Sequence, residues 1–371
     1  MANLIDLILT TSFVTSEGRL PAVGLNTAAF VSGDADATLN LKLYTDAETV
    51  DADVTATDLT AQAAVQIKAI LAQGPKVGGV RLIVYDGAGV GTPATGLTAA
   101  VTSGSLPGWS YAAIVVQSRV DATIASASTW AHTNARGQAL VFGQLNTSSI
   151  LSGTVPAGIA ASAGADLTCV CFDPTNANAS IEDAVGWILS VDPTTSRAGF
   201  GIQRPLGLVA YSTELTLAEA ALASGRESGQ ASCWIHGPLY PADSRRVIVQ
   251  GYTIGRTLAE VEWGVIVLEM QSRAAVAQLV AQRAELQLPL RTTAGDGAAI
   301  QSVIDAVFAR GASSGFIERG IAANAATGQP SLPDGYVLSV TFSGTTAVVT
   351  GWAAYPGDVR RISLSITGVV T

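Results

Sequence analysis

The chain has 371 residues, a length that predicts two or three packed units. Hydrophobic residues make up 48% of it and charged residues only 13%, about half the usual charged share. A surface this poor in charge indicates either extensive coverage by partner molecules or a covering of short Ala, Gly, Ser and Thr side chains. The net charge of −9 argues against an extensive nucleic-acid contact, which needs a basic stripe.

The start of the chain and its cysteines exclude further classes. The first residues, MANLIDLILTTSF, contain no basic residue, and Asp6 interrupts their apolar run, so they do not match a signal peptide. No apolar run of about 18 residues occurs, so no membrane span is expected. The 3 cysteines, an odd number, give no disulfide framework and fit a protein made in a reducing cytoplasm.

An apolar residue at every second position predicts a strand at the N-terminus, formed around Ile5, Leu7 and Leu9. A polar stretch with Gly and Pro, residues 15–24, follows it without periodicity. Such a terminal strand either docks locally or pairs with the sheet edge of another subunit.

Strand and helix patterns alternate over the next part of the chain, which predicts α/β layering and a mostly parallel sheet. The expected strands are 27–31, 40–44, 80–86, 111–117, 138–142, 167–172, 207–210, 232–236 and 246–253. The expected helices are 58–73, 121–134, 181–191 and 217–225.

A glycine-rich turn, DGAGVG at residues 86–91, follows one expected strand and is of the type that cradles a phosphate. Pro93 comes soon after, and the residues beyond it predict no strong helix, so an anion would find no helix N-terminus to bind. We therefore expect a loop or an inserted hairpin there. A Rossmann-like nucleotide-binding enzyme that uses this turn remains an alternative function.

No set of residues predicts catalysis or metal binding. Cys169 and Cys171 lie on an expected strand without a second Cys or His pair at ligand spacing, so two small buried side chains are expected. Four aspartates are interpreted as polar turn residues: Asp34, Asp36, Asp51 and Asp53. We therefore expect no enzyme, no cofactor and no metal site.

A long helix is expected over residues 257–286, where apolar residues recur near helical spacing. Thr257 with Glu260 makes a capping box for its start. Pro289 stops it, because the proline ring removes a donor and clashes with the preceding turn.

A loop over residues 290–297 leads to a second expected helix at 298–310. This helix ends at Gly311 and Gly315, which suit a left-handed cap. Together the two helices predict a helical hairpin.

Strand patterns return at the end of the chain. Residues 336–342 and 347–352 predict a β-hairpin around residues 343–345. The last segment, 360–367, alternates strictly with period two. Its apolar positions are Ile362, Leu364 and Ile366. The chain is therefore expected both to begin and to end in a strand.

Short motifs stand in order along the C-terminal third: Glu262-Trp263, Leu288-Pro289-Leu290, Thr292-Thr293, Asp296-Gly297 and Gly315-Phe316-Ile317. Their order resembles the C-terminal domain of contractile phage tail sheath proteins. There an acidic residue and Trp on a long helix precede a K-I-P-Y-T-D-x-G loop, a second helix and a G-x-I turn into strands. The chain departs from that pattern at Leu290, where the family has an aromatic residue, and no basic residue precedes Pro289.

The resemblance implies a mixed α/β core domain followed by an α+β C-terminal domain. The second domain would contain a helical hairpin and a β-hairpin, and the chain would extend N- and C-terminal β arms. The expected segments are an N-terminal arm at 1–20, an α/β sheath domain at 21–224, a C-terminal α+β core domain at 225–354 and a C-terminal arm at 355–371.

The resemblance also implies a structural subunit that polymerises as stacked hexameric rings around a tail tube and contracts to drive the tube through the host envelope. The expected partners are further copies of the chain, the tube protein, and baseplate and tail terminator proteins, without nucleic acid or membrane insertion. The subunit would assemble in the host cytoplasm and reside in the virion tail. Another virion tail component, a tube or baseplate protein, remains an alternative.

Two groups of residues are assigned by the resemblance. The arm strands that add to neighbouring sheets would carry Ile5, Leu7, Leu9, Ile362, Leu364 and Ile366. The charged residues of a C-terminal helix that faces the tube would be Arg273, Arg283, Asp305 and Arg310. A solvated helix face is the alternative explanation for this second group.

Overall fold

The computed structural model describes most of the chain from residue 26 onward. It does not describe residues 1–25, 75–76, 86–90, 103–110, 135–138, 146–156, 174–178, 191–201, 204–233, 239–245, 250–252, 256, 289, 344–345, 356–357 and 368–371. Strands 202–203, 234–238, 246–249 and 358–367 are described by their backbone only. The predicted strand around Ile5, Leu7 and Leu9 therefore lies outside the described residues, as do the predicted strand 207–210 and helix 217–225.

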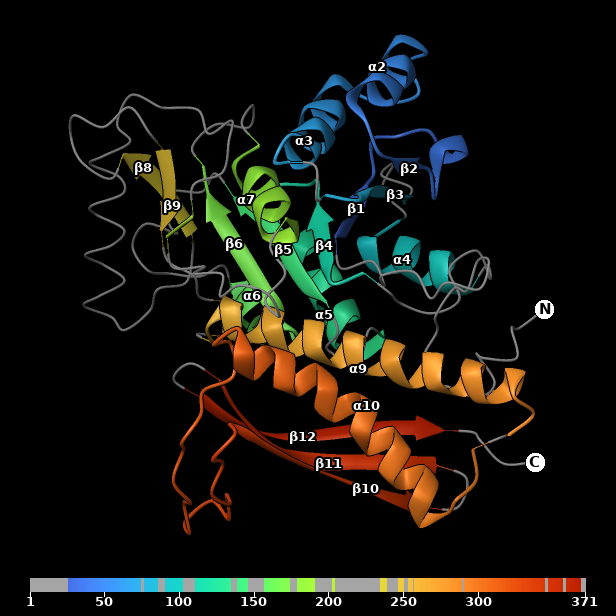
Figure 1. Cartoon of the computed structure of the whole chain (residues 1–371). Coiled ribbons are helices and arrows are strands. Elements are labelled where there is room, and N and C mark those ends of the chain that lie inside the picture. Colours follow the sequence, from blue (N-terminus) through green and yellow to red (C-terminus); the bar gives the residue numbers. More distant parts are fainter. Residues whose placement is uncertain are drawn as a thin grey trace.

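A nine-stranded sheet forms the first domain, in the order β2-β3-β1-β4-β5-β6-β8-β9-β7 (Figure 1). Its strands are β1 Thr27–Ser32, β2 Leu43–Tyr44, β3 Gly79–Val84, β4 Ala113–Val116, β5 Leu140–Leu145, β6 Thr168–Phe172, β7 Ile202–Gln203, β8 Trp234–Pro238 and β9 Arg246–Val249. The pairs from β3 to β8 in this row are parallel, and the pairs that include β2, β7 or β9 are antiparallel. The prediction of a mostly parallel sheet is confirmed.

Helices cover both faces of this sheet, which explains why the central strands are continuous apolar runs. The helical elements are η1 Ala37–Leu39, α2 Ala47–Thr55, α3 Ala61–Leu71, α4 Pro93–Thr102, α5 Asp121–Asn134, α6 Ala157–Ala160, η3 Ala165–Leu167 and α7 Ser180–Leu189. On one face, Ile67 of α3 and Ile181 of α7 share a core with Phe30 of β1. On the other, Leu97 of α4 and Ile124 of α5 share a core with Val31.

The helix α4 corrects one prediction. No helix was expected after the glycine-rich turn, yet α4 begins at Pro93, two residues after Gly91. Proline suits the first turn of a helix, because the amide hydrogen that it lacks has no partner there. The α4 sequence is rich in Ala, Thr and Gly and shows little periodicity, so its stability comes from packing: Leu97 is fully buried. The helix α2 was also missed, and it contains Asp51 and Asp53, so the interpretation of these two aspartates as turn residues is wrong.

The boundary of the first domain also differs from the prediction. β8 and β9 belong to the nine-stranded sheet, so the domain extends to Val249 and beyond the expected limit at residue 224. The reason is topological: β8 pairs in parallel with β6, far back in the chain, which no local pattern reveals.

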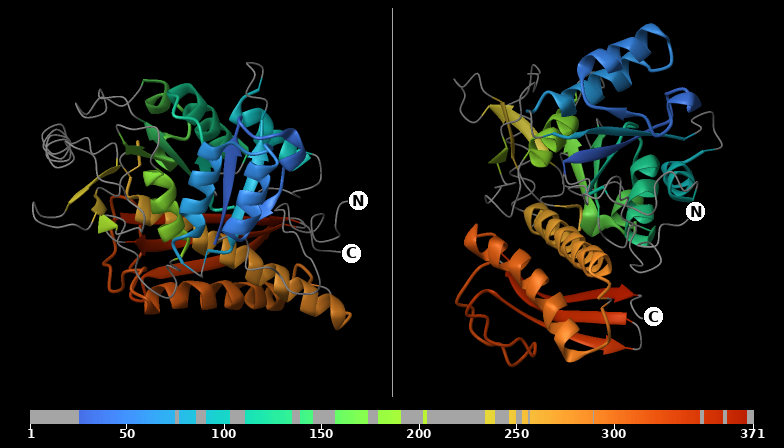
Figure 2. Two further views of the ribbon diagram at one scale, coloured as in Figure 1. Left: turned by 90° about the horizontal axis from the view of Figure 1, so that it is seen from above. Right: turned by 45° about the vertical axis from the view of Figure 1, so that its right-hand side comes forward.

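The long helix α9 (Ala259–Glu285) lies between the nine-stranded sheet and the C-terminal domain (Figures 1 and 2). The segment before it is anchored to the first domain, because the Ile254 amide donates to the Thr168 carbonyl at 2.8 Å. The Thr257 hydroxyl donates to the Asp166 carbonyl at 3.2 Å. The N-cap is Leu258, without a side-chain hydrogen bond, so the predicted Thr257/Glu260 capping box is wrong.

By length and hydropathy alone, α9 would pass as a membrane-spanning helix, and 56% of its most apolar stretch is buried inside the protein. Core helices of soluble proteins have the same composition. Trp263, Val267 and Met270 are almost fully buried in contact with the rest of the chain, which makes α9 a core helix of this fold.

The helical hairpin is confirmed with shifted ends. α9 stops at Glu285, before Pro289, and Gln287 has a left-handed φ of 56°. The second helix, α10 (Ala294–Ser313), starts four residues before the predicted position because Thr293 caps it: its hydroxyl accepts from the Asp296 amide at 3.2 Å. The predicted left-handed cap is confirmed at Gly315, whose φ is +79°.

Three antiparallel strands complete the C-terminal domain in the order β10-β11-β12. They are β10 Tyr336–Ser343, β11 Thr346–Tyr355 and β12 Asp358–Thr367. The predicted β-hairpin corresponds to β10 and β11. β12 corrects the picture of an extended C-terminal arm, because it pairs with β11 of the same chain along its whole length.

The register explains the alternation of the last segment. Ile362, Leu364 and Ile366 stand opposite Gly351, Val349 and Ala347 of β11. Only two residues separate the ends of β11 and β12, and closing so short a loop costs little entropy, so local pairing is favoured.

Candidate assembly interface

One face of the three-stranded sheet is closed by α10. The rings of Phe308 and Tyr336 pack at 5.4 Å between centroids. The Tyr336 hydroxyl donates to the Asp305 carbonyl at 3.2 Å, and the Gln301 amide donates to the Leu338 carbonyl at 3.1 Å. These contacts fix the helix on the sheet.

The turn after α10 inserts an aromatic ring between α9 and the sheet. Phe316 is fully buried and packs on Tyr355 at 5.5 Å between ring centroids. On the other side its ring occupies the space over Gly264: a Cβ there would lie 1.6 Å from the ring. Gly264 is therefore required at this crossing, although glycine is unfavourable inside a helix. α9, α10 and the sheet form one packed unit.

The opposite face of the sheet is open. Val337, Ser339 and Thr341 of β10 are exposed, with 43% of Val337 accessible, and Thr350 and Trp352 of β11 are half-buried. Side chains of this face and the turn at 327–328 border a shallow groove of about 450 Å³. β10 and β11 carry no charged side chain, so these two strands present hydroxyl and apolar groups on this face.

The sheet also has two open edges. β10 and β12 are its outer strands, and within the described residues neither pairs with a further strand. An outer strand presents a row of unpaired backbone donors and acceptors to any chain that approaches. The edges span 8 residues in β10 and 10 in β12, longer than an average strand.

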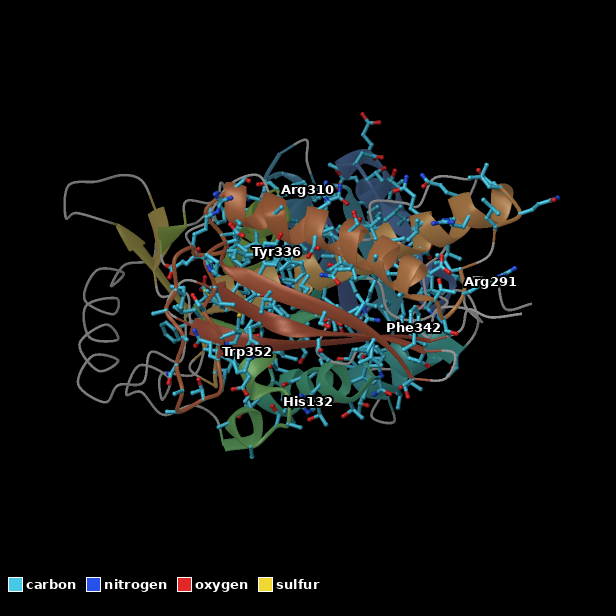
Figure 3. The ribbon with its side chains drawn as sticks, turned by 60° about the horizontal axis from the view of Figure 1, so that its bottom comes forward. His132, Arg291, Arg310, Tyr336, Phe342 and Trp352 are labelled. Atoms are coloured by element: carbon cyan, nitrogen blue, oxygen red, sulfur yellow. The ribbon has the colours of Figure 1, made fainter. Side chains whose placement is uncertain are left out.

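The four predicted tube-facing residues do not form one charged surface. Arg273 is buried and pairs with Glu269 one turn earlier on α9, so it cannot meet a partner as a free charge. The prediction is corrected for this residue, because the central part of α9 is enclosed by both domains. Arg283 and Asp305 are half-buried, and Arg310 is exposed near the C-terminal end of α10 (Figure 3).

A second positive group lies at the other end of α10. Arg291 is exposed beside the N-terminus of that helix (Figure 3), and its amide donates to Asp296 at 3.0 Å. The Thr293 hydroxyl bond, that amide and the nearby charges of Arg283 and Arg291 lower the pKa of Asp296. Arg283, in the last turn of α9, therefore lies near the start of α10.

Sequence reasoning missed an apolar feature of the same connection. Leu286 and Leu288 are 67% and 55% exposed, although they adjoin the buried Leu290. Large apolar side chains exposed together at a helix end make this connection a candidate contact surface. The signal was present in the run LQLPL, which continues the apolar character of α9 beyond its last turn.

Cys169 and Cys171 are both fully buried on β6, as predicted. No cluster of three or more His, Cys, Asp or Glu side chains in the described ranges is arranged to hold a metal ion. His132 is exposed at the end of α5 (Figure 3).

Sequence comparison matches this chain to no family model and to no curated protein. Structural comparison does: the sheath tail protein of Listeria innocua superposes with a TM-score of 0.60 at 8% identity, over 96% of both chains. The chain has the fold of a tail sheath protein. A sheath tail protein of Desulfitobacterium hafniense matches with a TM-score of 0.44 at 12% identity, over 74% of this chain and 60% of the other.

The similarity to the Listeria innocua sheath protein extends over nearly the whole chain, so it includes the α/β domain as well as the C-terminal domain. The motifs quoted above covered only the C-terminal third. At 8% identity this similarity establishes a shared fold and not a shared role.

Proposed function

We propose that this protein is the structural subunit of a contractile phage tail sheath. The observation that carries the proposal is the end-to-end match with the fold of a sheath tail protein. The open sheet of the C-terminal domain supports it, because a polymer subunit needs surfaces that remain available after folding.

The subunits polymerise as hexameric rings stacked around a tail tube, and the assembled sheath contracts to drive the tube through the host envelope. The low content of charged residues, 13%, fits a surface that is covered by neighbouring copies. The baseplate and tail terminator proteins are the partners at the two ends. The particle is assembled in the host cytoplasm and the sheath belongs to the virion tail.

Neighbouring subunits are joined by added strands. The N-terminal strand around Ile5, Leu7 and Leu9 pairs with an open edge of a neighbour's three-stranded sheet. Backbone hydrogen bonds supply the affinity, and the alternating apolar side chains set the register. β12, which carries Ile362, Leu364 and Ile366, acts through its outer edge while its inner edge stays paired with β11.

The tube contact is electrostatic and comes from the helical hairpin. Because Arg273 is buried, the positive candidates are Arg283 and Arg310. Asp305, the acidic candidate, lies in the middle part of α10. The tube surface that they meet is acidic. Reversing both positive charges, Arg283→Glu with Arg310→Glu, weakens attachment to the tube without changing polymerisation of the sheath alone.

Negative-stain electron microscopy of the purified protein tests the proposal. We expect hollow helical tubes from the full chain and monomers from a variant that lacks residues 1–12. As a control, this variant should unfold at the same denaturant concentration as the full chain. A chain that stays monomeric at high concentration both alone and in the presence of its tube protein contradicts the sheath role. Normal tubes from the truncated chain contradict the arm mechanism alone.

A further inference from the structure

A polar cavity lies in the α/β domain, remote from the three-stranded sheet. Its volume is about 480 Å³, within the range of small-molecule pockets. Residues that follow β1, β3 and β4 border it, so it opens at the carboxyl ends of three neighbouring parallel strands.

The topology of the sheet explains the hollow. From β1 the chain continues to β2 and β3 on one side, whereas from β4 it continues to β5 on the other side. The connections that leave the carboxyl ends of these two adjacent strands run in opposite directions. This is the switch point at which open α/β sheets bind their ligands.

Acceptor groups border the cavity. The Asp34 carboxylate stands at the end of β1 and is exposed. The Gln117 amide at the end of β4 donates to it at 2.8 Å, which holds the carboxylate at the cavity. The Tyr85 hydroxyl is close enough to sense this charge, because burial and then Asp34 raise the pKa of Tyr85.

Donor groups border the cavity as well. The side-chain nitrogen of Gln62, in the first turn of α3, is buried and has no hydrogen-bond acceptor among the described residues. A buried amide without an acceptor is unfavourable, so an acceptor at this place would be bound favourably. Arg119 and Thr123 border the same space, and the Arg119 charge is balanced by Glu182 at 3.5 Å.

The charges and donors restrict the chemistry of a ligand. Because Glu182 offsets Arg119, the carboxylate of Asp34 is the uncompensated charge, and it opposes an anion such as a phosphate. A cationic amine would pair with Asp34 but would offer no acceptor to Gln62. A neutral hydroxyl group satisfies both, since it donates and accepts at once.

The geometry points to a binding site for a small neutral polyhydroxylated molecule, a free sugar or polyol, between Asp34 and Gln62 at the β1/β4 switch point. One hydroxyl donates to Asp34, another accepts from Gln62, and Tyr85 contacts the ring. This site is separate from the assembly surfaces of the C-terminal domain, so it adds a second property to the proposed sheath subunit.

Ligand-observed NMR titration of the full chain tests the site, with D-glucose, D-ribose and myo-inositol as separate probes and inorganic phosphate as the charged comparison. We expect millimolar binding of at least one hydroxylated probe and none of phosphate. Asp34→Ala and Gln62→Leu each weaken binding about tenfold, the effect of losing one hydrogen bond to a charged or buried group. Asp334→Ala, which removes an exposed aspartate in the other domain, leaves binding unchanged.

Absence of binding by all three hydroxylated probes overturns the proposal. So does binding that survives both cavity variants, or binding of phosphate in preference to the sugars. Circular dichroism of each variant confirms that the fold is kept. The sheath role is unaffected by any of these results, because tube formation is scored separately by microscopy.

Discussion

The nine-stranded sheet is covered by helices on both faces, whereas the described three-stranded sheet is covered on one face and open on the other and at its two edges. The central strands β4, β5 and β6 of the first sheet are buried along their whole length. The second leaves backbone groups and side chains available after folding. In the proposed sheath, the α/β domain would serve as a rigid body and the C-terminal domain as the connector between subunits.

The largest loss of stability is expected from a substitution at Gly264, where α9 packs tightly against Phe316. Gly264→Ala places a Cβ against the Phe316 ring, and we expect a loss of about 3 kcal/mol in the free energy of unfolding. Denaturant unfolding followed by circular dichroism measures it. Adding Phe316→Leu should recover part of the loss. Gly295→Ala is the matched control, because its Cβ would meet no atom closer than 3.9 Å. Equal stability of the two single variants would refute the packing account.

A smaller loss of stability is expected from a substitution inside the α/β domain. In α7, a Cβ on Gly186 would lie 2.4 Å from the Ile70 carbonyl oxygen of α3, so Gly186→Ala should cost about 1–3 kcal/mol. Thermal unfolding provides the measurement. Gly158→Ala is the control, since a Cβ there meets nothing within 4 Å. An unchanged melting temperature for Gly186→Ala would show that α3 and α7 separate easily.

The same helix pair predicts a dependence on pH. Burial and the neighbouring Glu182 raise the pKa of Asp183 to about 8, and the Gln73 amide donates to it at 2.9 Å. Because the folded-state pKa is above the unfolded value near 3.8, the stabilising proton is retained at low pH and lost as the pH rises towards 8.

Asp183→Asn removes this titration while keeping an oxygen for Gln73. We expect the variant to be more stable than the wild type by about 1–3 kcal/mol at pH 8 and nearly equal at pH 4. Urea unfolding at several pH values measures the difference. The exposed Asp334→Asn should follow the wild-type curve. If the wild type instead became more stable relative to Asp183→Asn between pH 4 and pH 8, the predicted direction of the pH dependence would be contradicted.

The smallest effect is expected at the start of α10. Thr293→Ala removes the hydroxyl that caps this helix and should cost about 1 kcal/mol. Thr293→Ser, which keeps the hydroxyl, serves as the control in the same unfolding experiment. A loss of similar size in both variants would show that the methyl group of Thr293 matters more than the cap.

Local patterns predicted those elements whose partners are near in sequence. The α5 bounds, the β10–β11 hairpin and the Gly315 cap follow from periodicity and backbone preference. α4 was missed because its residues are small and its stability comes from packing on distant strands. β12 shows a different limit: alternation identifies a strand but not the edge with which it pairs.

The candidate interface was predicted in part. The alternating segments and the helical hairpin were found, but Arg273 was placed on a surface, because charge alone does not show that both domains enclose α9. The cavity at the β1/β4 switch point could not be predicted at all. Asp34, Gln62 and Tyr85 come from three separate elements, and only the parallel sheet brings them together.

The most direct test of the connector is a cryo-electron microscopy reconstruction of the assembled tube in which residues 1–20 are traced. We predict that the N-terminal strand of one subunit pairs with the open edge of the three-stranded sheet of its neighbour. An N-terminal strand that docks on its own chain, with β10 and β12 unpaired at their outer edges, would contradict the account.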